Sequence, residues 1–587
     1  MTAQNISMIN EEGKKALKSK LQFVYDTKTA DYLLKSIIKL MSDYEKLIPT
    51  QNKKEEFVSE KDTILITYGD SIKEAGKAPL QSLHEFLNES VKDTLTGVHI
   101  LPFYPYSSDD GFSVKDYFAV NPELGNWEDI EKLSSDYELM FDGVINHISA
   151  KSEWFEEYLK GNPKYKNFFV EADPNADYSK VTRPRALPLL TKFETSEGTK
   201  YIWTTFSDDQ IDLNYENPEL VLKIVELLLF YISKGAKLIR LDAIGFMWKE
   251  LGTTCIHLEQ VHKLIQIFRD ITDAIAPDTI LITETNVPHK DNISYFGNGY
   301  NEARMVYQFP LPPLTLNSFL TGNANHLATW AHNLEETTEE TTFFNFLASH
   351  DGVGVRPVEG ILTKKEVEAM IDKVHEHGGN VSYKDNGDGT KSPYELNINY
   401  FDALSHPDDH QELKVKRFIA AQSVLLSMVG VPGIYIHSLL GSRNYYKGVE
   451  ETGRFRSINR EKLDRGVIEE ELKDTSSIRY QVLSQMKQLI ETRTQEKAFH
   501  PNSSQQVLFL NDHVFSFIRT NKDNPEEKIV VLVNVSDELQ SLLLNLFEND
   551  MREKSVLTDL ISGYKPSIQD GETKITLSPY QVMWLKG

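Results

Sequence analysis

Eight short apolar segments, most of them separated by amphipathic helical stretches, constrain the fold of this chain more than any other feature. Each segment has the length of a strand and is rich in Ile, Val, Leu or Phe, which is typical of strands buried on both faces. Alternation of such strands with helices predicts an α/β fold, a parallel (β/α)8 TIM barrel. The expected strands are 63–68, 97–102, 139–146, 237–242, 279–284, 304–309, 342–348 and 431–437.

The segments outside this alternation predict three additions to the barrel. Residues 1–60 are rich in Lys and Glu and place Leu33, Ile37 and Met41 at helical spacing, which indicates an N-terminal helical extension. The barrel is expected over 61–504, with inserted subdomains at about 148–215 and 352–412, because both connections are too long for ordinary loops. Residues 505–587 alternate apolar runs with polar turns and predict a C-terminal all-β domain.

Composition restricts the partners that this chain can bind. The formal net charge of −24 would repel nucleic acid and anionic membrane surfaces, so we expect neither as a partner. No run of about 18 apolar residues and no secretory signal is visible, and the single cysteine, Cys255, cannot form an intramolecular disulfide. We therefore expect a cytoplasmic monomer or homodimer that acts on a small molecule.

Three of the expected strands end in acidic residues, Asp242, Glu284 and Asp351. Arg240 lies two residues before Asp242, on the same face of its strand, and His350 directly precedes Asp351. The carboxyl ends of barrel strands meet at one face of the barrel, where active sites lie. Retaining glycoside chemistry uses two carboxyl groups about 5–5.5 Å apart. The pattern therefore predicts cleavage or transfer of a glycosidic bond.

The neighbours of these carboxylates suggest different protonation states. Arg240 should hold Asp242 ionised and oriented, as a nucleophile requires. Glu284 follows an apolar strand without an adjacent basic residue, so burial should raise its pKa and keep it protonated as an acid.

Five ordered motifs resemble those of the α-amylase family of glycoside hydrolases. They are Asp-Gly-Val-Ile-Asn-His at 142–147, Gln-Ile-Asp-Leu-Asn at 210–214, Arg-Leu-Asp-Ala at 240–243, Thr-Glu at 283–284 and His-Asp at 350–351. The resemblance implies Asp242 as nucleophile, Glu284 as general acid and base, and Asp351 as the residue that binds sugar hydroxyls in the transition state. It also implies that His147, Arg240 and His350 contact the donor sugar.

Three further stretches, 108–112, 183–188 and 454–460, resemble the sucrose phosphorylase group of this family. That resemblance implies that Asp109 and Arg456 bind the far hydroxyls of the donor glucose and close the pocket around one sugar. It also implies that Arg183 and Arg185 bind phosphate, although a surface salt bridge is an alternative role for these two side chains.

The segments 248–259, 378–384 and 392–397 are similar to those of glucosylglycerate phosphorylases and their glucosylglycerol-acting relatives. The implied reaction is retaining phosphorolysis of a small α-glucoside, 2-O-α-D-glucosylglycerate, to α-glucose 1-phosphate. A glucosyl-enzyme intermediate would form, with inorganic phosphate as co-substrate. We expect no cofactor and no metal, because this group lacks the calcium ion that amylases bind at the position of Asn146.

The acceptor is the least defined part of this prediction. The candidates for binding it lie in the second insertion, although these residues could instead hold the insertion together: Lys384, Tyr394, Glu395 and Asn397. Alternative activities are phosphorolysis of glucosylglycerol, sucrose or sucrose 6-phosphate, and hydrolysis or transglucosylation of an α-glucoside. These reactions share the first chemical step and differ in the leaving group or in the second nucleophile.

Overall fold

The computed structural model describes residues 9–49, 56–185, 187–386, 389–546, 548–549, 551 and 556–587. Its centre is a closed barrel of eight parallel strands that follow one another around the ring in chain order. The strands are β1 (Ile64–Thr67), β3 (Gly97–Ile100), β4 (Glu138–Gly143), β9 (Ala236–Leu241), β10 (Ile280–Thr283), β11 (Met305–Tyr307), β12 (Thr342–Asn345) and β16 (Val431–Tyr435). All eight coincide with predicted strands, so the predicted fold class is confirmed.

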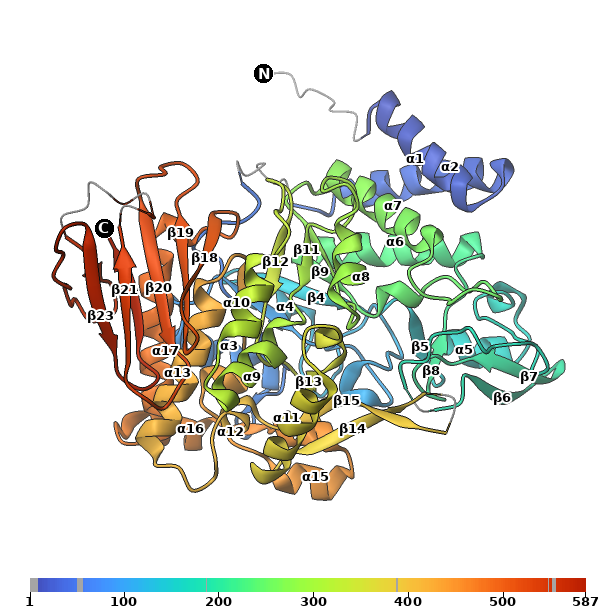
Figure 1. The fold of residues 1–587 in the computed structure, drawn as a ribbon. Coiled ribbons are helices and arrows are strands. Elements are labelled where there is room, and N and C mark those ends of the chain that lie inside the picture. The colour runs from blue at the N-terminus through green and yellow to red at the C-terminus, as the bar shows by residue number, and fades with distance from the viewer. Residues whose placement is uncertain are drawn as a thin grey trace.

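Helices surround the barrel, as Figure 1 shows. The longer ones that follow the barrel strands are α3 (Pro79–Ser90), α4 (Trp127–Ser134), α6 (Pro218–Ser233), α7 (Glu259–Ile275), α9 (Leu311–Thr321), α10 (Asn325–His332), α13 (Gln411–Ser427) and α17 (Ile478–Thr494). Local signals fix several of their first turns. In α6, Pro218 occupies the first turn, where its missing N–H costs no hydrogen bond, and the Asn217 side chain accepts from Glu219 N.

The strands end earlier than the apolar runs predict. The runs expected at 139–146 and 342–348 end as strands at Gly143 and Asn345. Asp242 and Glu284 lie immediately after β9 and β10. The N–H of Asp242 donates to Gly143 O and that of Glu284 donates to Leu241 O, both at 3.1 Å, so each extends the hydrogen bonding between neighbouring strands by one bond. Both carboxylates therefore have rigid backbone positions at the rim of the barrel.

An antiparallel pair of helices forms the described N-terminal region. Helix α1 (Glu11–Val24) packs on α7, and α2 (Thr27–Glu45) packs on α6. Leu33, Ile37 and Met41 are buried, as their spacing predicts. The Tyr25 hydroxyl between the helices donates to the carbonyl oxygen of Tyr215 at 2.6 Å, so the helical pair is attached to the barrel.

Both long connections form small subdomains above the barrel rim. The first contains β5 (His147–Ser149), α5 (Glu153–Leu159), β6 (Leu190–Thr195), β7 (Gly198–Trp203) and β8 (Gln210–Asp212). The second contains β13 (Val353–Gly354), α11 (Lys364–Glu376), β14 (Asn380–Asp385), β15 (Lys391–Asn397) and α12 (Tyr400–Ala403). Strands β14 and β15 are a hairpin, closed by a hydrogen bond from Asn386 N to Thr390 O. The sequence Asp-Asn-Gly-Asp-Gly-Thr at 385–390 is typical of a tight turn, and its residues Gly387 and Asp388 lie outside the described residues.

The C-terminal region is a β structure packed against the barrel helices. Its larger sheet has the order β18 (Ser504–Asn511), β19 (Val514–Thr520), β20 (Lys528–Asn534), β24 (Val582–Lys586) and β22 (Thr558–Asp559), and a second sheet pairs β21 (Gln540–Asn545) with β23 (Glu572–Leu577). Apolar runs in the sequence predict strands at 507–510, 513–518, 528–534 and 574–577, which correspond to β18, β19, β20 and β23. Strands β21, β22 and β24 are short or only weakly alternating in sequence and were not predicted.

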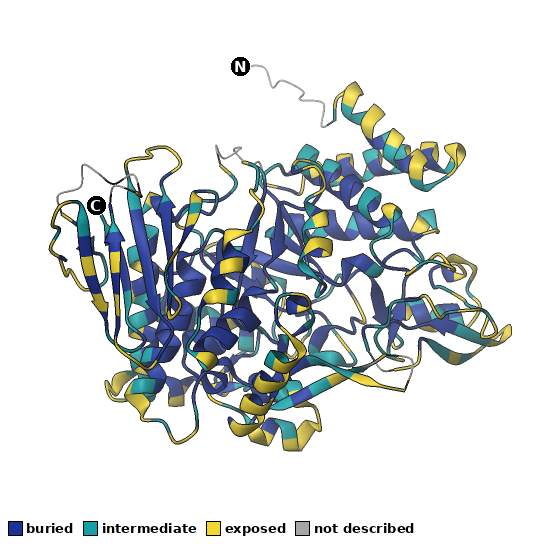
Figure 2. Cartoon of the chain, in the orientation of Figure 1, coloured by how far each residue is buried: buried dark blue, intermediate teal, exposed yellow. Residues whose placement is uncertain are grey.

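Burial follows this architecture. Figure 2 shows a buried barrel interior and exposed outer faces on the surrounding helices. One continuous hydrophobic core runs from Leu17 in α1 through the barrel to Trp584 in β24. In the described part of the chain, no helix combines the length and the apolar character needed to cross a membrane.

Candidate active site

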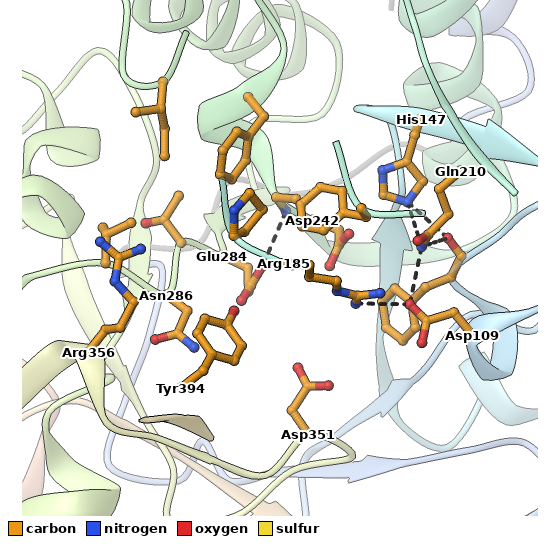
Figure 3. A pocket seen from close by; sticks show the side chains of 18 of the residues that line it. Asp109, His147, Arg185, Gln210, Asp242, Glu284, Asn286, Asp351, Arg356 and Tyr394 are labelled. Carbon is orange, nitrogen blue, oxygen red and sulfur yellow. Dashed lines mark hydrogen bonds and ion pairs between the residues drawn. The ribbon is translucent and has the colours of Figure 1, made fainter. Parts of the chain in front are cut away.

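A pocket opens at the C-terminal ends of the barrel strands (Figure 3). Asp242 and Glu284 reach it directly from β9 and β10, and Asp351 reaches it from the loop after β12. The predicted site residues that line it are Asp109, His147, Arg185, Asp242, Glu284, His350, Asp351, Tyr394 and Arg456. The structure therefore brings together residues separated by more than 300 positions in the sequence.

The guanidinium of Arg240 lies beneath the pocket among three carboxylates. Its Nη1 donates to Asp142 Oδ1 and, at 2.8 Å, to Asp242 Oδ1, and its Nη2 lies 3.7 Å from Glu284 Oε2. Asp142 is fully buried and is also bound by His99 Nε2 at 2.6 Å. Arg240 thus places one positive charge next to both Asp242 and Glu284.

Asp142 and His99 were not among the predicted site residues. Asp142 stands in one of the motifs quoted above, and its position near the end of a strand was the available signal. His99 lies in β3 without a distinguishing pattern.

Glu284 and Asp242 differ in how strongly they are held ionised. Burial raises the pKa of Glu284 to about 7; Arg240 opposes this shift and the negative charge of Asp242 adds to it. Burial also raises the pKa of Asp242, and Arg240 opposes that shift too. Because Asp242 has the shorter contact with the guanidinium, Glu284 takes the first proton of the pair.

The expectation that Arg240 holds Asp242 ionised and oriented stays a prediction. Burial raises the pKa of Asp242, and Arg240, which also pairs with the buried Asp142, opposes this rise. The predicted rise in the pKa of Glu284 is present.

The chain turns sharply after Asp242. Ala243 adopts a left-handed conformation with φ 49°, which costs a residue with a Cβ about 1 kcal/mol. This conformation directs Ala243 N toward Glu284 Oε2, to which it donates at 3.2 Å. The strained turn thus links the backbone after Asp242 to the side chain of Glu284.

Asp351 belongs to a cationic cluster on another wall of the pocket. Arg456 Nη1 lies 2.6 Å from Asp351 Oδ1, and Arg460 Nη2 lies 3.6 Å from the same oxygen. Burial alone would raise the pKa of Asp351, but Arg456, His350 and Arg460 together lower it below its ordinary value. Asp351 is therefore held as an anion, in contrast to Glu284.

Asp109, His147 and Gln210 form one end of the pocket, visible together in Figure 3. Gln210 Nε2 donates to Asp109 Oδ2 at 3.2 Å, and His147 Nε2 lies 2.9 Å from the carbonyl oxygen of Phe112. Burial lowers the pKa of His147, so the imidazole is neutral and Nε2–H donates to that carbonyl. His350 stacks on the Phe112 ring at 4.7 Å, which positions a second neutral imidazole.

Arg183 and Arg185 have different environments. Arg185 lines the pocket and pairs with Asp109 at 3.2 Å. The guanidinium of Arg183 instead donates to the carbonyl oxygen of Leu187 in its own loop, and Arg183 is not a lining residue of this pocket. The geometry therefore favours Arg185 alone as the anion-binding residue of this loop.

The candidate acceptor-binding residues of the second insertion differ in whether they line the pocket. Tyr394 lines the pocket, whereas Glu395 binds Arg456 Nε at 3.0 Å and supports it from behind. Asn397 Nδ2 donates to Ser382 Oγ at 2.8 Å within the β14–β15 hairpin, a structural role. Lys384 is not a lining residue.

Several lining residues were missed by the sequence analysis. They are Phe112, Phe206, Gln210, Phe246, Asn286 and Arg356, of which Gln210 was quoted in a motif without a role. Asn286 and Arg356 carry hydrogen-bonding groups at the end of the pocket away from Asp109 (Figure 3).

Asn146 lies beside a lysine ammonium. Lys249 Nζ lies 2.6 Å from Asp212 Oδ2 and 3.3 Å from Asn146 Oδ1, and also binds the carbonyl oxygen of Phe246. The ammonium neutralises the charge of Asp212 and occupies the neighbouring oxygen atoms, so this position is a poor site for an additional cation.

Known proteins resemble this chain over nearly its whole length. Residues 91–381 match the family of the α-amylase catalytic domain. A glucosylglycerate phosphorylase of Spirochaeta thermophila is 45% identical over 97% of this chain and 98% of its own length. A glucosylglycerate phosphorylase of Allomeiothermus silvanus is 51% identical over 82% of this chain and 86% of its own length.

A solved structure agrees with the fold. The crystal structure of sucrose 6F-phosphate phosphorylase from Thermoanaerobacter thermosaccharolyticum superposes with a TM-score of 0.70 at 24% identity, and it covers 81% of this chain and 94% of that protein.

Proposed function

The chain belongs to the glucosylglycerate phosphorylase family, within the larger family of α-amylase-type proteins, and from this premise we propose that it is a retaining glycoside phosphorylase. Its reaction converts 2-O-α-D-glucosylglycerate and phosphate into α-D-glucose 1-phosphate and glycerate. The observation that carries the proposal is the pair Asp242 and Glu284 next to the Arg240 guanidinium, in a pocket at the carboxyl ends of the barrel strands.

Asp242 performs the first displacement. Its carboxylate attacks the anomeric carbon, the glycosidic bond breaks, and Glu284 gives its proton to the departing oxygen of glycerate. Because the pKa of Glu284 is about 7, a large share of this acid is protonated at neutral pH. The product of this step is a glucosyl-enzyme ester with the configuration inverted at the anomeric carbon.

Phosphate performs the second displacement. A phosphate oxygen attacks the anomeric carbon, Glu284 takes the proton of a protonated phosphate, and the ester bond to Asp242 breaks. Two inversions give net retention, so the product is the α-anomer of glucose 1-phosphate. Arg185 supplies positive charge for phosphate at the rim of the pocket, where its side chain is 29% exposed.

Asp109 and Asp351 bind the hydroxyls of the glucosyl group. Arginines hold both carboxylates ionised, and an ionised carboxylate accepts hydrogen bonds from hydroxyls more strongly than a neutral group does. Together with Arg456 they enclose a small space, which favours a single sugar over a chain of sugars.

Omitting phosphate tests the proposal. Enzyme and glucosylglycerate, with and without phosphate, are sampled for glucose and for glucose 1-phosphate. We expect rapid glucose 1-phosphate formation with phosphate and only slow glucose release without it. Equal glucose release in both samples, without glucose 1-phosphate, would identify a hydrolase. The Asp242→Asn variant should be inactive in both samples and still folded, as shown by its circular dichroism spectrum.

A further inference from the structure

Arg356 lies at the end of the pocket opposite the proposed glucose-binding residues. In Figure 3, Arg356 and Asn286 stand on one side, Asp109, His147 and Gln210 on the other, and the reacting carboxylates between them. This is the side on which a leaving group protonated by Glu284 would extend.

The backbone around Arg356 is firmly placed. Arg356 begins a short 3-10 helix (Arg356–Val358), with one residue, Val355, between it and the end of β13, and Val355 N donates to Tyr394 O at 3.1 Å. A Cβ at Gly354 would lie 2.8 Å from Asn286 Nδ2, so the Asn286 amide packs against the strand that leads to Arg356. Asn286, Tyr394 and Arg356 therefore form one fixed wall.

The charge of Arg356 is less well compensated than that of the other arginines that line the pocket. Arg185 and Arg456 have carboxylates at 3.2 and 2.6 Å, whereas the nearest carboxylate to Arg356 among the described residues, Glu359, is 3.8 Å away and 54% exposed. The Arg356 side chain is only 17% exposed, and its Nε has no hydrogen-bond partner within the described part of the chain. A largely buried guanidinium without a close counter-ion favours binding of an anion.

Lys384 does not line the pocket, but its charge acts on that of Arg356. Burial lowers the pKa of Lys384, the positive charge of Arg356 lowers it further, and Glu359 opposes the shift. Lys384 therefore adds positive charge near Arg356 and does not compensate it.

We propose that Arg356 binds the carboxylate of the glycerate group and thereby makes the enzyme prefer glycerate to neutral acceptors such as glycerol. This assignment rests on the proposed function. Arginine offers a planar pair of N–H groups that matches a carboxylate, and Asn286 offers an amide for the neighbouring hydroxyl. Arg356 takes the role for which Lys384 was the candidate in the sequence.

Phosphate is the competing anion. In a double displacement, the leaving group and the second nucleophile use the same face of the anomeric carbon, so phosphate enters the space that glycerate leaves. The two cations therefore have separate functions: Arg356 binds glycerate and Arg185 binds phosphate.

Two assays with Arg356→Met distinguish these roles. The first measures the KM for glycerate during glucosyl transfer from glucose 1-phosphate. The second measures exchange of labelled phosphate into glucose 1-phosphate without any acceptor, which needs the glucose and phosphate sites alone. We expect the KM for glycerate to rise about 100-fold, because a buried charge pair loses one partner. Phosphate exchange should stay within about threefold of wild type.

Matched variants complete the test. Lys365→Met removes an exposed cation of the same insertion, from α11, and should change neither assay. Arg185→Met should show the reverse pattern, with slower phosphate exchange and a smaller change in the KM for glycerate. Arg356→Lys keeps the positive charge but loses the planar pair of N–H groups, and should raise the KM for glycerate about 10-fold.

The outcomes are distinct. An unchanged KM for glycerate in Arg356→Met, or a parallel loss of phosphate exchange, overturns the assignment. If Arg356→Met fails to fold, an unchanged KM in Arg356→Lys overturns it instead. Failure of the proposed function would appear differently, as a wild-type enzyme that neither exchanges phosphate nor transfers glucose to glycerate.

Discussion

At the scale of single residues, one guanidinium organises the reacting groups. Arg240 is almost completely buried and contacts Asp142 and Asp242, with Glu284 slightly farther away. The buried Asp142 takes part of its charge, so Arg240 stabilises the anionic forms of Asp242 and Glu284 only in part. When two carboxyl groups differ in pKa, one can act as the nucleophile and the other as the general acid.

A pH profile tests this division. We expect kcat/KM for glucosylglycerate to fall as the pH rises through about 7, because burial raises the pKa of Glu284 to about 7 and only the protonated form donates to glycerate. The same shift affects stability: the raised pKa stabilises the fold fully below about pH 4.5, and this contribution is lost as the pH rises to about 7.

Glu284→Gln is the control for both measurements. The variant should lack the decline near pH 7 in its residual activity. In chemical denaturation, the wild type should lose up to about 3 kcal/mol of unfolding free energy between about pH 4.5 and 7. The variant should not show this loss. A decline at the same pH in both proteins would assign it to another group.

At the scale of elements, strand ends place the reacting carboxylates and the inserted hairpin places the acceptor wall. Backbone hydrogen bonds hold Asp242 and Glu284 beside β9 and β10, whereas Arg356 and Tyr394 depend on the small sheet of β13, β14 and β15. The residues of the first displacement are thus positioned by the barrel, and those that select the acceptor are positioned by an insertion. The N-terminal helical pair contributes at this scale too, because α1 and α2 pack on α7 and α6, the helices next to β9.

Ile37→Ala tests whether the helical pair belongs to the same folding unit. Ile37 is fully buried in α2, so we expect the variant to lose about 2–4 kcal/mol in urea-induced unfolding monitored by circular dichroism. Ile38→Ala, at a half-buried neighbouring position, should lose clearly less. A separate early transition with an unchanged main transition would show that the helices unfold independently.

At the scale of the whole molecule, a continuous hydrophobic core and buried arginines join the barrel to the C-terminal sheet. Arg519 in β19 is fully buried and donates to the carbonyl oxygens of Ser427, at the end of α13, and of His500. Burial lowers the pKa of Arg519 to about 9, which reflects the cost of enclosing its charge. The hydrogen bonds to several carbonyl oxygens offset this cost.

Arg519→Met should weaken this connection without altering the pocket. The variant leaves buried carbonyl oxygens without donors, and we expect a loss of about 2–4 kcal/mol in unfolding free energy with kcat at 25 °C unchanged. Thermal unfolding measures the change in stability, and an activity assay at 25 °C on a separate, folded sample measures kcat. A lower kcat with unchanged stability would contradict the structural role.

The barrel and the three strand-end carboxylates could be predicted without a structure. Short apolar runs alternate with helices, and residues at strand ends of a parallel barrel meet at one face, so Asp242, Glu284 and Asp351 could be grouped without coordinates. The resemblance of their motifs to a known family supplied the expected roles.

Which charges face the pocket depends on tertiary packing. The fold separates Arg185 from Arg183, directs Asn397 into its hairpin, adds the buried Asp142, and places Arg356 at the acceptor end, where the sequence had suggested Lys384. Apart from Asp142, which lies in β4, these side chains lie on long insertions, whose packing on the barrel depends on distant contacts. Neither strand periodicity nor spacing along the chain fixes the direction of a side chain there.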